Sequence, residues 1–299
     1  MNPDRLFDRV YGEYERYLVV PILMLVLAVS ALGLNYVQTG SFLQKGIDFT
    51  GGSEITYSVE GEFTPEEAES AFRQAGRSDV QASKQISGNR TLLLVQVPPP
   101  DVNRTQAESI MSGAGFETTV QGFRSISSSV SGQFFLQAQL AFGLAFTIMS
   151  IVIFVAFRDV VPSLAVIFAA MGDVLFAAAG MAVLGIPLTL GSLAALLMLI
   201  GYSVDTDIVL STRVLKRQRG SLKSRIWSSV KTGVTMSSGG IAGFTILYLV
   251  STSIVGPSEL SNIAAVMVIG LLADMPITWL GNAIVLKKHV SEEVETPWS

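Results

Sequence analysis

Residues 137–157 read QAQLAFGLAFTIMSIVIFVAF without a charged side chain, and after the polar pair Arg158-Asp159, residues 161–184 read VPSLAVIFAAMGDVLFAAAGMAVL. A bilayer core about 30 Å thick needs roughly 20 apolar residues in a helix. Each stretch is long enough to cross a membrane and too long for an ordinary core helix. We therefore interpret them as two consecutive transmembrane helices.

The rest of the chain divides into apolar stretches that suit a membrane and charged stretches that suit water. Only 15% of the residues are charged, 49% are hydrophobic and the mean hydropathy is +0.50, whereas soluble domains carry about a quarter charged residues. Charges are frequent from residue 45 to 124 and scarce from 137 to 286. Four more apolar stretches predict further transmembrane helices, at residues 17–37, 188–212, about 232–250 and 260–286.

These spans predict a polytopic α-helical membrane protein with six transmembrane helices and one extracytoplasmic α+β domain inserted between helices 1 and 2. The expected parts are a cytoplasmic N-terminus with the first helix (1–37), the outer domain (38–132), helices 2 to 6 (133–288) and a cytoplasmic tail (289–299). A charged segment from Asp4 to Arg16 precedes the first apolar run and no small-residue cleavage site follows it, so we do not expect a cleavable signal peptide.

Loop charge predicts the orientation, because Lys and Arg concentrate on the cytoplasmic side. The loop from Arg213 to Lys231 is rich in basic residues and the tail begins Lys287-Lys288, whereas the connections at 185–187 and 251–259 contain neither Lys nor Arg. We therefore expect both termini in the cytoplasm and residues 38–132 outside, in a cell membrane.

The outer segment alternates between strand and helix patterns. Thr64-Pro65-Glu66-Glu67 is typical of a helix start, and Ser87-Gly88-Asn89 of a hairpin turn. The expected elements are strands at 53–59, 80–86, 90–97 and 117–123 and helices at 64–75 and 103–114. This β-α-β-β-α-β order predicts a ferredoxin-like fold.

Composition argues against enzymatic chemistry. There is no Cys, which excludes disulfides, zinc–thiolate sites and thiol nucleophiles. The only histidine, His289, falls in the expected tail, so we expect it to be neither a ligand nor a relay. The carboxylates of the outer domain are scattered, which favours a binding or docking module. We expect no catalysis, cofactor or metal, and the net charge of -4 does not favour nucleic acid.

Four carboxylates fall within the predicted spans: Asp173, Asp205, Asp207 and Asp274. A charge at the bilayer centre costs at least about 2.5–3.5 kcal/mol on insertion scales, so such residues are functional candidates. Side chains two apart on a helix point about 200° apart, so Asp205 and Asp207 cannot line one narrow face. Two roles for the four carboxylates stay open: they form a proton relay, or they make structural hydrogen bonds to Ser, Thr or Asn on neighbouring helices. Lys231 is either a counter-cation or a side chain that snorkels to the interface.

The segment Gly46-Ile47-Asp48-Phe49-Thr50-Gly51-Gly52 follows the first span. Three glycines so close together indicate unusual backbone angles or close backbone approach. We expect a rigid joint between the outer domain and the bundle, with a ligand-binding loop as the alternative.

Two motifs and the arrangement of helices resemble the SecF family, the smaller partner in the SecD–SecF protein-export complex, which belongs to the resistance–nodulation–division superfamily. Residues 46–52 match the family's G-[IL]-D-F-x-G-G. Residues 201–207, read Gly201-Tyr202-Ser203-Val204-Asp205-Thr206-Asp207 and followed by Arg213, resemble its G-Y-S-[IV]-N-D-T…R-[IV] signature, and residues 172–174 resemble its H-D-V. The usual Asp of that signature falls on Thr206 here. This departure, together with the absence of Cys, looks more archaeal than bacterial.

The resemblance implies an accessory subunit of the Sec translocon that assists export of unfolded preproteins, surrounded by membrane lipid and paired with a SecD-type subunit next to the translocon channel. It further implies that the proton gradient is coupled to movement of the outer domains. Our hypothesis is that Asp205 and Asp207 bind and release protons and that residues 46–52 pass motion to the outer domain. Two other functions remain open: a homo-oligomeric exporter of small molecules or lipids, and a passive translocon scaffold.

Overall fold

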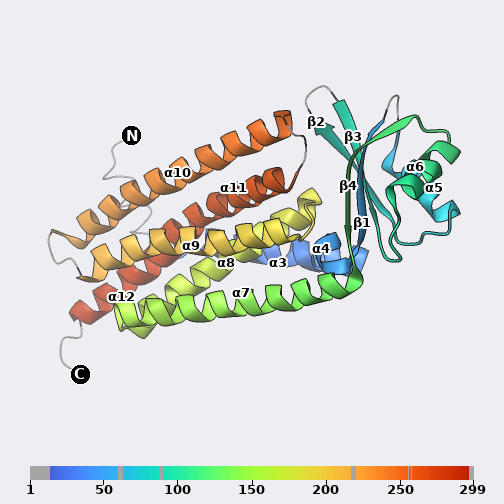
Figure 1. The fold of residues 1–299 in the computed structure, drawn as a ribbon. Helices are drawn as coiled ribbons and strands as arrows, with labels where there is room; N and C mark the ends of the chain where they lie inside the picture. Colours follow the sequence, from blue (N-terminus) through green and yellow to red (C-terminus); the bar gives the residue numbers. More distant parts are fainter. Residues whose placement is uncertain are drawn as a thin grey trace.

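The computed structural model describes residues 14–59, 63–87, 90–216, 220–254, 256 and 258–295. Long helices lie side by side as a bundle, and a sheet domain stands at one end of it (Figure 1). The charged segment before residue 14, the turn residues 88–89, residues 217–219 of the basic loop and residues 296–299 lie outside the described residues.

In the described part of the chain, six helical stretches are long and apolar enough to cross a membrane. They confirm the expected number of spans and the mainly helical fold class. A short helix, α2 (Tyr14–Tyr17), precedes them. The six stretches contain α3 (Val19–Thr39), α7 (Ser128–Phe157), α8 (Val160–Leu184), α9 (Leu190–Ser211), α10 (Leu222–Ile254) and α11 (Glu259–Ile277). The fourth stretch continues beyond α9 to Lys216 and the sixth beyond α11 to Ser291.

Several helices extend beyond the predicted spans. Helix α7 begins at Ser128 and not at residue 137, and α10 begins at Leu222 and not at residue 232. A helix continues past the hydrocarbon layer as long as its backbone bonds are made, whereas hydropathy detects only the apolar part. The expected limit of the outer domain, residue 132, consequently lies inside α7, and the described part of the expected tail, residues 289–295, lies in α12 (Ala283–Glu295).

Two π-helical turns were not predicted. One, η1 (Thr212–Lys216), continues α9, and the other, η2 (Thr278–Asn282), joins α11 to α12. Such turns occur mostly as short inserts in helices and are frequent at functional sites.

The outer domain has the predicted order of elements. They are β1 (Gly52–Val59), α5 (Pro65–Gln74), β2 (Gln81–Ser87), β3 (Arg90–Val97), α6 (Arg104–Gly113) and β4 (Thr118–Ile126). The strands form an antiparallel sheet in the order β2-β3-β1-β4, as in a ferredoxin-like fold. At the predicted helix start, Thr64 forms a capping box with Glu67 of α5, which satisfies free backbone N–H groups there.

The sheet separates the domain's own core from the bundle. Helices α5 and α6 cover the sheet face turned away from the bundle (Figure 1). Alternate strand residues such as Ile55, Leu93 and Val95 pack there against Phe72 of α5 and Met111 of α6. The other face of the sheet is turned toward the ends of the membrane helices.

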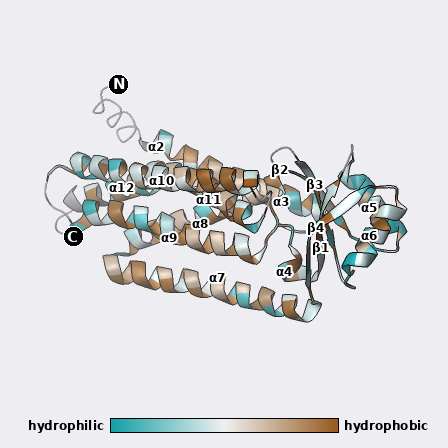
Figure 2. Cartoon of the chain, turned by 45° about the horizontal axis from the view of Figure 1, so that its top comes forward, coloured by the Kyte–Doolittle hydropathy of each residue, from teal (hydrophilic) through white to brown (hydrophobic). Residues whose placement is uncertain are grey.

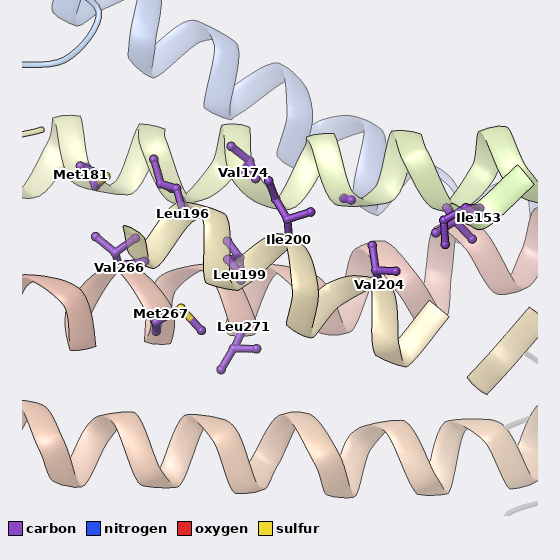
Figure 3. Close-up of a cluster of buried hydrophobic side chains, with 14 residues drawn as sticks. Ile153, Val174, Met181, Leu196, Leu199, Ile200, Val204, Val266, Met267 and Leu271 are labelled. Carbon is purple, nitrogen blue, oxygen red and sulfur yellow. The ribbon is translucent and has the colours of Figure 1, made fainter. Parts of the chain in front are cut away.

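Helices α8, α9 and α11 form the centre of the bundle. Within the most apolar part of each helix, 50% of the residues of α8 and α9 and 56% of those of α11 are buried, against 6% to 17% for α3, α7 and α10. Leu199, Val174 and Met267 interlock between the three central helices (Figure 3). The peripheral helix α7 exposes large apolar side chains such as Leu140, Leu144 and Ile148, and most of its ribbon has the hydrophobic colours in Figure 2, as expected where lipid surrounds it.

Candidate functional site

Three of the four predicted carboxyl groups meet in the centre of the bundle. Asp173 of α8, Asp207 of α9 and Asp274 of α11 are each fully buried. Ser203, one turn before Asp207 on α9, donates a hydrogen bond to Asp173. The cluster thus joins the three helices that form the core.

A single hydroxyl group connects two of the carboxyls. Thr278 Oγ1 lies 3.1 Å from Asp207 Oδ1 and 3.1 Å from Asp274 Oδ1. A hydroxyl has one hydrogen, so it donates to only one carboxyl at a time. The second contact is a hydrogen bond only when the other carboxyl carries a proton and donates it to Thr278. The geometry therefore suits a pair of carboxyls that holds a proton.

Two more neutral side chains complete the contacts. Asn282 Nδ2 donates to Asp207 Oδ1 at 2.7 Å, and Ser237 Oγ of α10 donates to Asp274 Oδ2 at 3.2 Å. Asp274, Thr278 and Asn282 recur every four residues, a spacing that drifts by about 40° per step in a regular α-helix. The wider turn of η2 opposes this drift and keeps the polar groups directed at α9.

Some oxygens of the cluster have no hydrogen-bond partner within the described residues. They are Asp173 Oδ1, Asp207 Oδ2, Ser211 Oγ and Asn282 Oδ1. A buried polar atom without a partner costs about 1–3 kcal/mol. These atoms are positions where a proton or a water molecule would lower the free energy of the site.

Asp205 and Lys231 do not join this cluster. Asp205 is exposed on the surface of the chain, on the opposite side of α9 from Asp207, together with Gly201 and Tyr202. Lys231 is also exposed, with Nζ 5.8 Å from the ring centroid of Trp227. The angular separation of the two α9 acids is as the sequence predicted. A relay role for Asp205 or Lys231 stays a prediction.

Arg213 and His289 lie at the end of the bundle opposite the outer domain. Arg213 of η1 donates to the Ser228 carbonyl at 2.7 Å and to Thr232 Oγ1 at 2.9 Å, and so links α9 to α10. His289 was assigned to a tail without a role, but it lies on α12 with Nε2 2.7 Å from Asp159 Oδ2. Since the two residues are far apart in the chain, no sequence pattern indicated this pair.

The glycine-rich motif adopts the unusual backbone that its composition predicted. It contains the short helix α4 (Ile47–Thr50), and Gly51 and Gly52 have φ angles of +74° and +108°. A Cβ atom on Gly52 would lie 2.2 Å from the Val97 carbonyl oxygen, and one on Gly51 would lie 3.0 Å from Ser128 Cα. Both positions therefore require glycine.

The same motif is attached to two different helices of the bundle. The ring of Phe49 packs edge-on against Phe135 of α7, with centroids 5.9 Å apart. The buried carboxylate of Asp48 accepts hydrogen bonds from the Leu190 N–H, in the first turn of α9, and from Arg124 of β4, each at 3.0 Å. The backbone adds a bond from the Gly46 N–H to the Leu188 carbonyl at 2.8 Å.

Comparison with known proteins identifies relatives of this chain. The family model described as protein export membrane protein SecD/SecF, C-terminal, matches residues 106–292, and the SecD/SecF GG motif model matches residues 43–62. The protein-export membrane protein SecF of Methanothermobacter thermautotrophicus is 39% identical over 95% of this chain and 96% of its own length. The SecF protein of Methanocaldococcus jannaschii is 33% identical over 94% of this chain and 97% of its own length.

A solved structure shares the fold. The crystal structure of SecDF from Thermus thermophilus, a translocon-associated membrane protein, matches 94% of this chain with a TM-score of 0.77 and 19% identity. The match spans only 38% of the SecDF chain. At this identity the likeness concerns the fold alone.

Proposed function

This chain belongs to the SecF family of protein-export membrane proteins, and on that premise we propose that it assists preprotein export together with a SecD-type partner, driven by the proton gradient. In this proposal both termini are cytoplasmic, and the outer domain, residues 38–132, acts on the unfolded preprotein as it leaves the translocon channel.

The observation that carries proton coupling is the Thr278 hydroxyl shared between Asp207 and Asp274. In the described part of the chain, the hydroxyl and amide side chains that donate hydrogen bonds to the three buried carboxyls are Ser203, Ser237, Thr278 and Asn282. None of these donors is charged, so none offsets a negative charge. Ionising several buried carboxyls at once is costly, and proton binding removes that cost. Release of a proton would then change which carboxyl accepts from Thr278 and so alter the packing of α11 against α9.

The exposed face of α9, which carries Asp205, supports the proposal of a SecD-type partner. An ionised Asp205 facing lipid would cost at least about 2.5–3.5 kcal/mol, whereas a polar surface of another subunit would remove much of this cost. Gly201, on the same face, has no atom within 4 Å of an added Cβ, which leaves room for a second helix to approach closely. We infer that the SecD-type partner covers this face and forms a heterodimer with the chain.

Affinity purification in mild detergent tests the partner. The tagged chain should recover a SecD-type protein, and Asp205→Leu, which fits lipid better, should recover less of it than Asp205→Asn, which keeps a polar group. A homo-oligomer without a Sec partner would contradict the proposal and favour an exporter of small molecules or lipids. Normal export by an Asp207→Asn variant would instead favour a passive scaffold.

A further inference from the structure

Asp48 lies where the outer domain, the glycine-rich motif and two core helices meet. Besides Asp48, Arg124 approaches Glu259 at the start of α11, with Nη1 3.7 Å from Oε1. Thr189, the N-cap residue of α9, donates from Oγ1 to Glu259 Oε2 at 2.8 Å. One connected set of polar contacts therefore joins β4 and α4 to the first turns of α9 and α11.

The buried Asp48 carboxylate has two tasks in this set. It accepts from a backbone N–H in the first turn of α9, where a negative charge is favoured by the helix dipole. Its other oxygen accepts from the guanidinium group of Arg124, a charge-assisted bond that is stronger than a neutral one. Removal of the carboxylate would weaken both connections at once.

The glycine-rich motif is attached to helices of two kinds, one without and others with a carboxyl of the buried cluster. The motif is already anchored through Phe49 to α7, a helix that contributes no carboxyl to the buried cluster. The Asp48 carboxylate itself reaches the first turn of α9, which carries Asp207. It reaches the first turn of α11, which carries Asp274, only through Arg124 and Glu259. The Gly46–Leu188 backbone bond holds the motif beside the start of α9 as well, and the Asp48 carboxylate adds the charged link between that helix and β4.

We propose that Asp48 is a positioning residue that fastens the outer domain to the first turns of α9 and α11, so that movement of the domain and rearrangement of the buried carboxyl cluster occur together. The inference rests on the proposed function, because it names the connection through which the proton site acts on the outer domain.

Asp48→Asn is the first test, because it keeps the shape and one acceptor oxygen but removes the charge. In membrane vesicles that contain the full chain and its SecD-type partner, we expect gradient-driven completion of export to slow by about tenfold, the factor that corresponds to about 1.4 kcal/mol. Arg124→Gln should slow it similarly. Co-purification of the partner should be unchanged, which excludes misfolding as the cause. Unchanged export in both variants would overturn the proposal.

A disulfide supplies the sharper test. An ideal Cβ on Gly46 would lie 3.8 Å from Thr189 Cβ, within the range of about 3.5–4.5 Å found in disulfides. The chain has no Cys of its own, so Gly46→Cys with Thr189→Cys gives one defined cross-link between the motif and α9. In a chain that also carries Asp48→Asn, oxidation should raise the export rate to near that of the same double-cysteine chain with Asp48 intact, and reduction should lower it again. Failure of the cross-link to restore export would overturn the proposal.

The same cross-link with Asp48 intact tests whether the joint stays closed. Relative to the same double-cysteine chain in its reduced form, we expect oxidation to change the export rate by less than about twofold, since a tight connection already exists. A stall on oxidation would show that the joint must open, contrary to the proposal. Asp207→Asn, assayed in parallel, distinguishes failure of the proposed function from failure of the positioning role of Asp48. Normal export by Asp207→Asn refutes the proposed function. A stall in Asp207→Asn together with normal export by Asp48→Asn refutes only the positioning role.

Discussion

Replacing Gly52 with alanine should loosen the outer domain where it joins the bundle. Gly52 is the first residue of β1, its φ angle is +108°, and an added Cβ would lie 2.2 Å from the Val97 carbonyl oxygen of β3. The atom in the way belongs to the backbone of a paired strand, so it cannot turn aside as a side chain would. The substitution must therefore either strain β1 or separate it from β3.

Two costs add at this position. An L-residue with a left-handed backbone costs about 1–2 kcal/mol, and forcing an atom into a packed site costs about 1–3 kcal/mol more. The expected loss is about 2–5 kcal/mol of the free energy that holds β1 against β3. Since each 1.4 kcal/mol is a factor of ten, amide exchange in these strands should become about 30-fold faster or more.

Hydrogen exchange of the full chain in detergent, read by mass spectrometry over β1 and β3, measures this loss. The matched control is Gly115→Ala in the same domain, because Gly115 has a φ angle of +86° and nothing within 4 Å of an added Cβ. It should pay only the backbone cost. Equal exchange rates in the two variants, within about twofold, would refute the argument that Val97 makes Gly52 necessary.

Burial raises the pKa of the Tyr57 hydroxyl, so the folded domain keeps this proton while the unfolded chain loses it above about pH 10. The stability of the domain should therefore fall as the pH rises past that point. Tyr57→Phe should reduce this fall, measured by circular dichroism. Asn282→Ala should lower the unfolding free energy by about 1–3 kcal/mol, seen as a lower melting temperature in detergent, because Asp207 loses its 2.7 Å donor. Gly233→Ala should lower the melting temperature as well, because an added Cβ would lie 2.1 Å from a tryptophan ring atom, whereas Gly239→Ala, with nothing within 4 Å, should not.

The outer domain was predictable because its signals are local. Thr64 and Pro65 mark the start of α5 within a few residues of the helix itself, and strand alternation sets which side chains enter the core. Helix limits in the membrane were less predictable. The first residues of α10 include Lys223 and Arg225, and such polar residues resemble a loop although the backbone there is helical.

The buried cluster was predictable only in part, for a geometric reason. The sequence of α9 alone shows that Asp205 and Asp207 point in different directions, but polar or small residues accompany both faces. Asp207 faces the core because Thr278 and Asn282 of η2 meet it there. A periodic pattern within one helix contains no information about a partner on another helix. The contact between Asp48 and Leu190 was hidden for the same reason.

If protons act on export through the buried carboxyls, the response of export to a proton gradient should depend on Asp207. The assay follows completion of preprotein export in vesicles containing the chain and its SecD-type partner, with and without an imposed proton gradient. We predict that the gradient accelerates export by the unsubstituted chain, and that Asp207→Asn loses this acceleration while it keeps its partner and its gradient-independent rate. Full acceleration by the gradient in the Asp207→Asn variant would contradict the account.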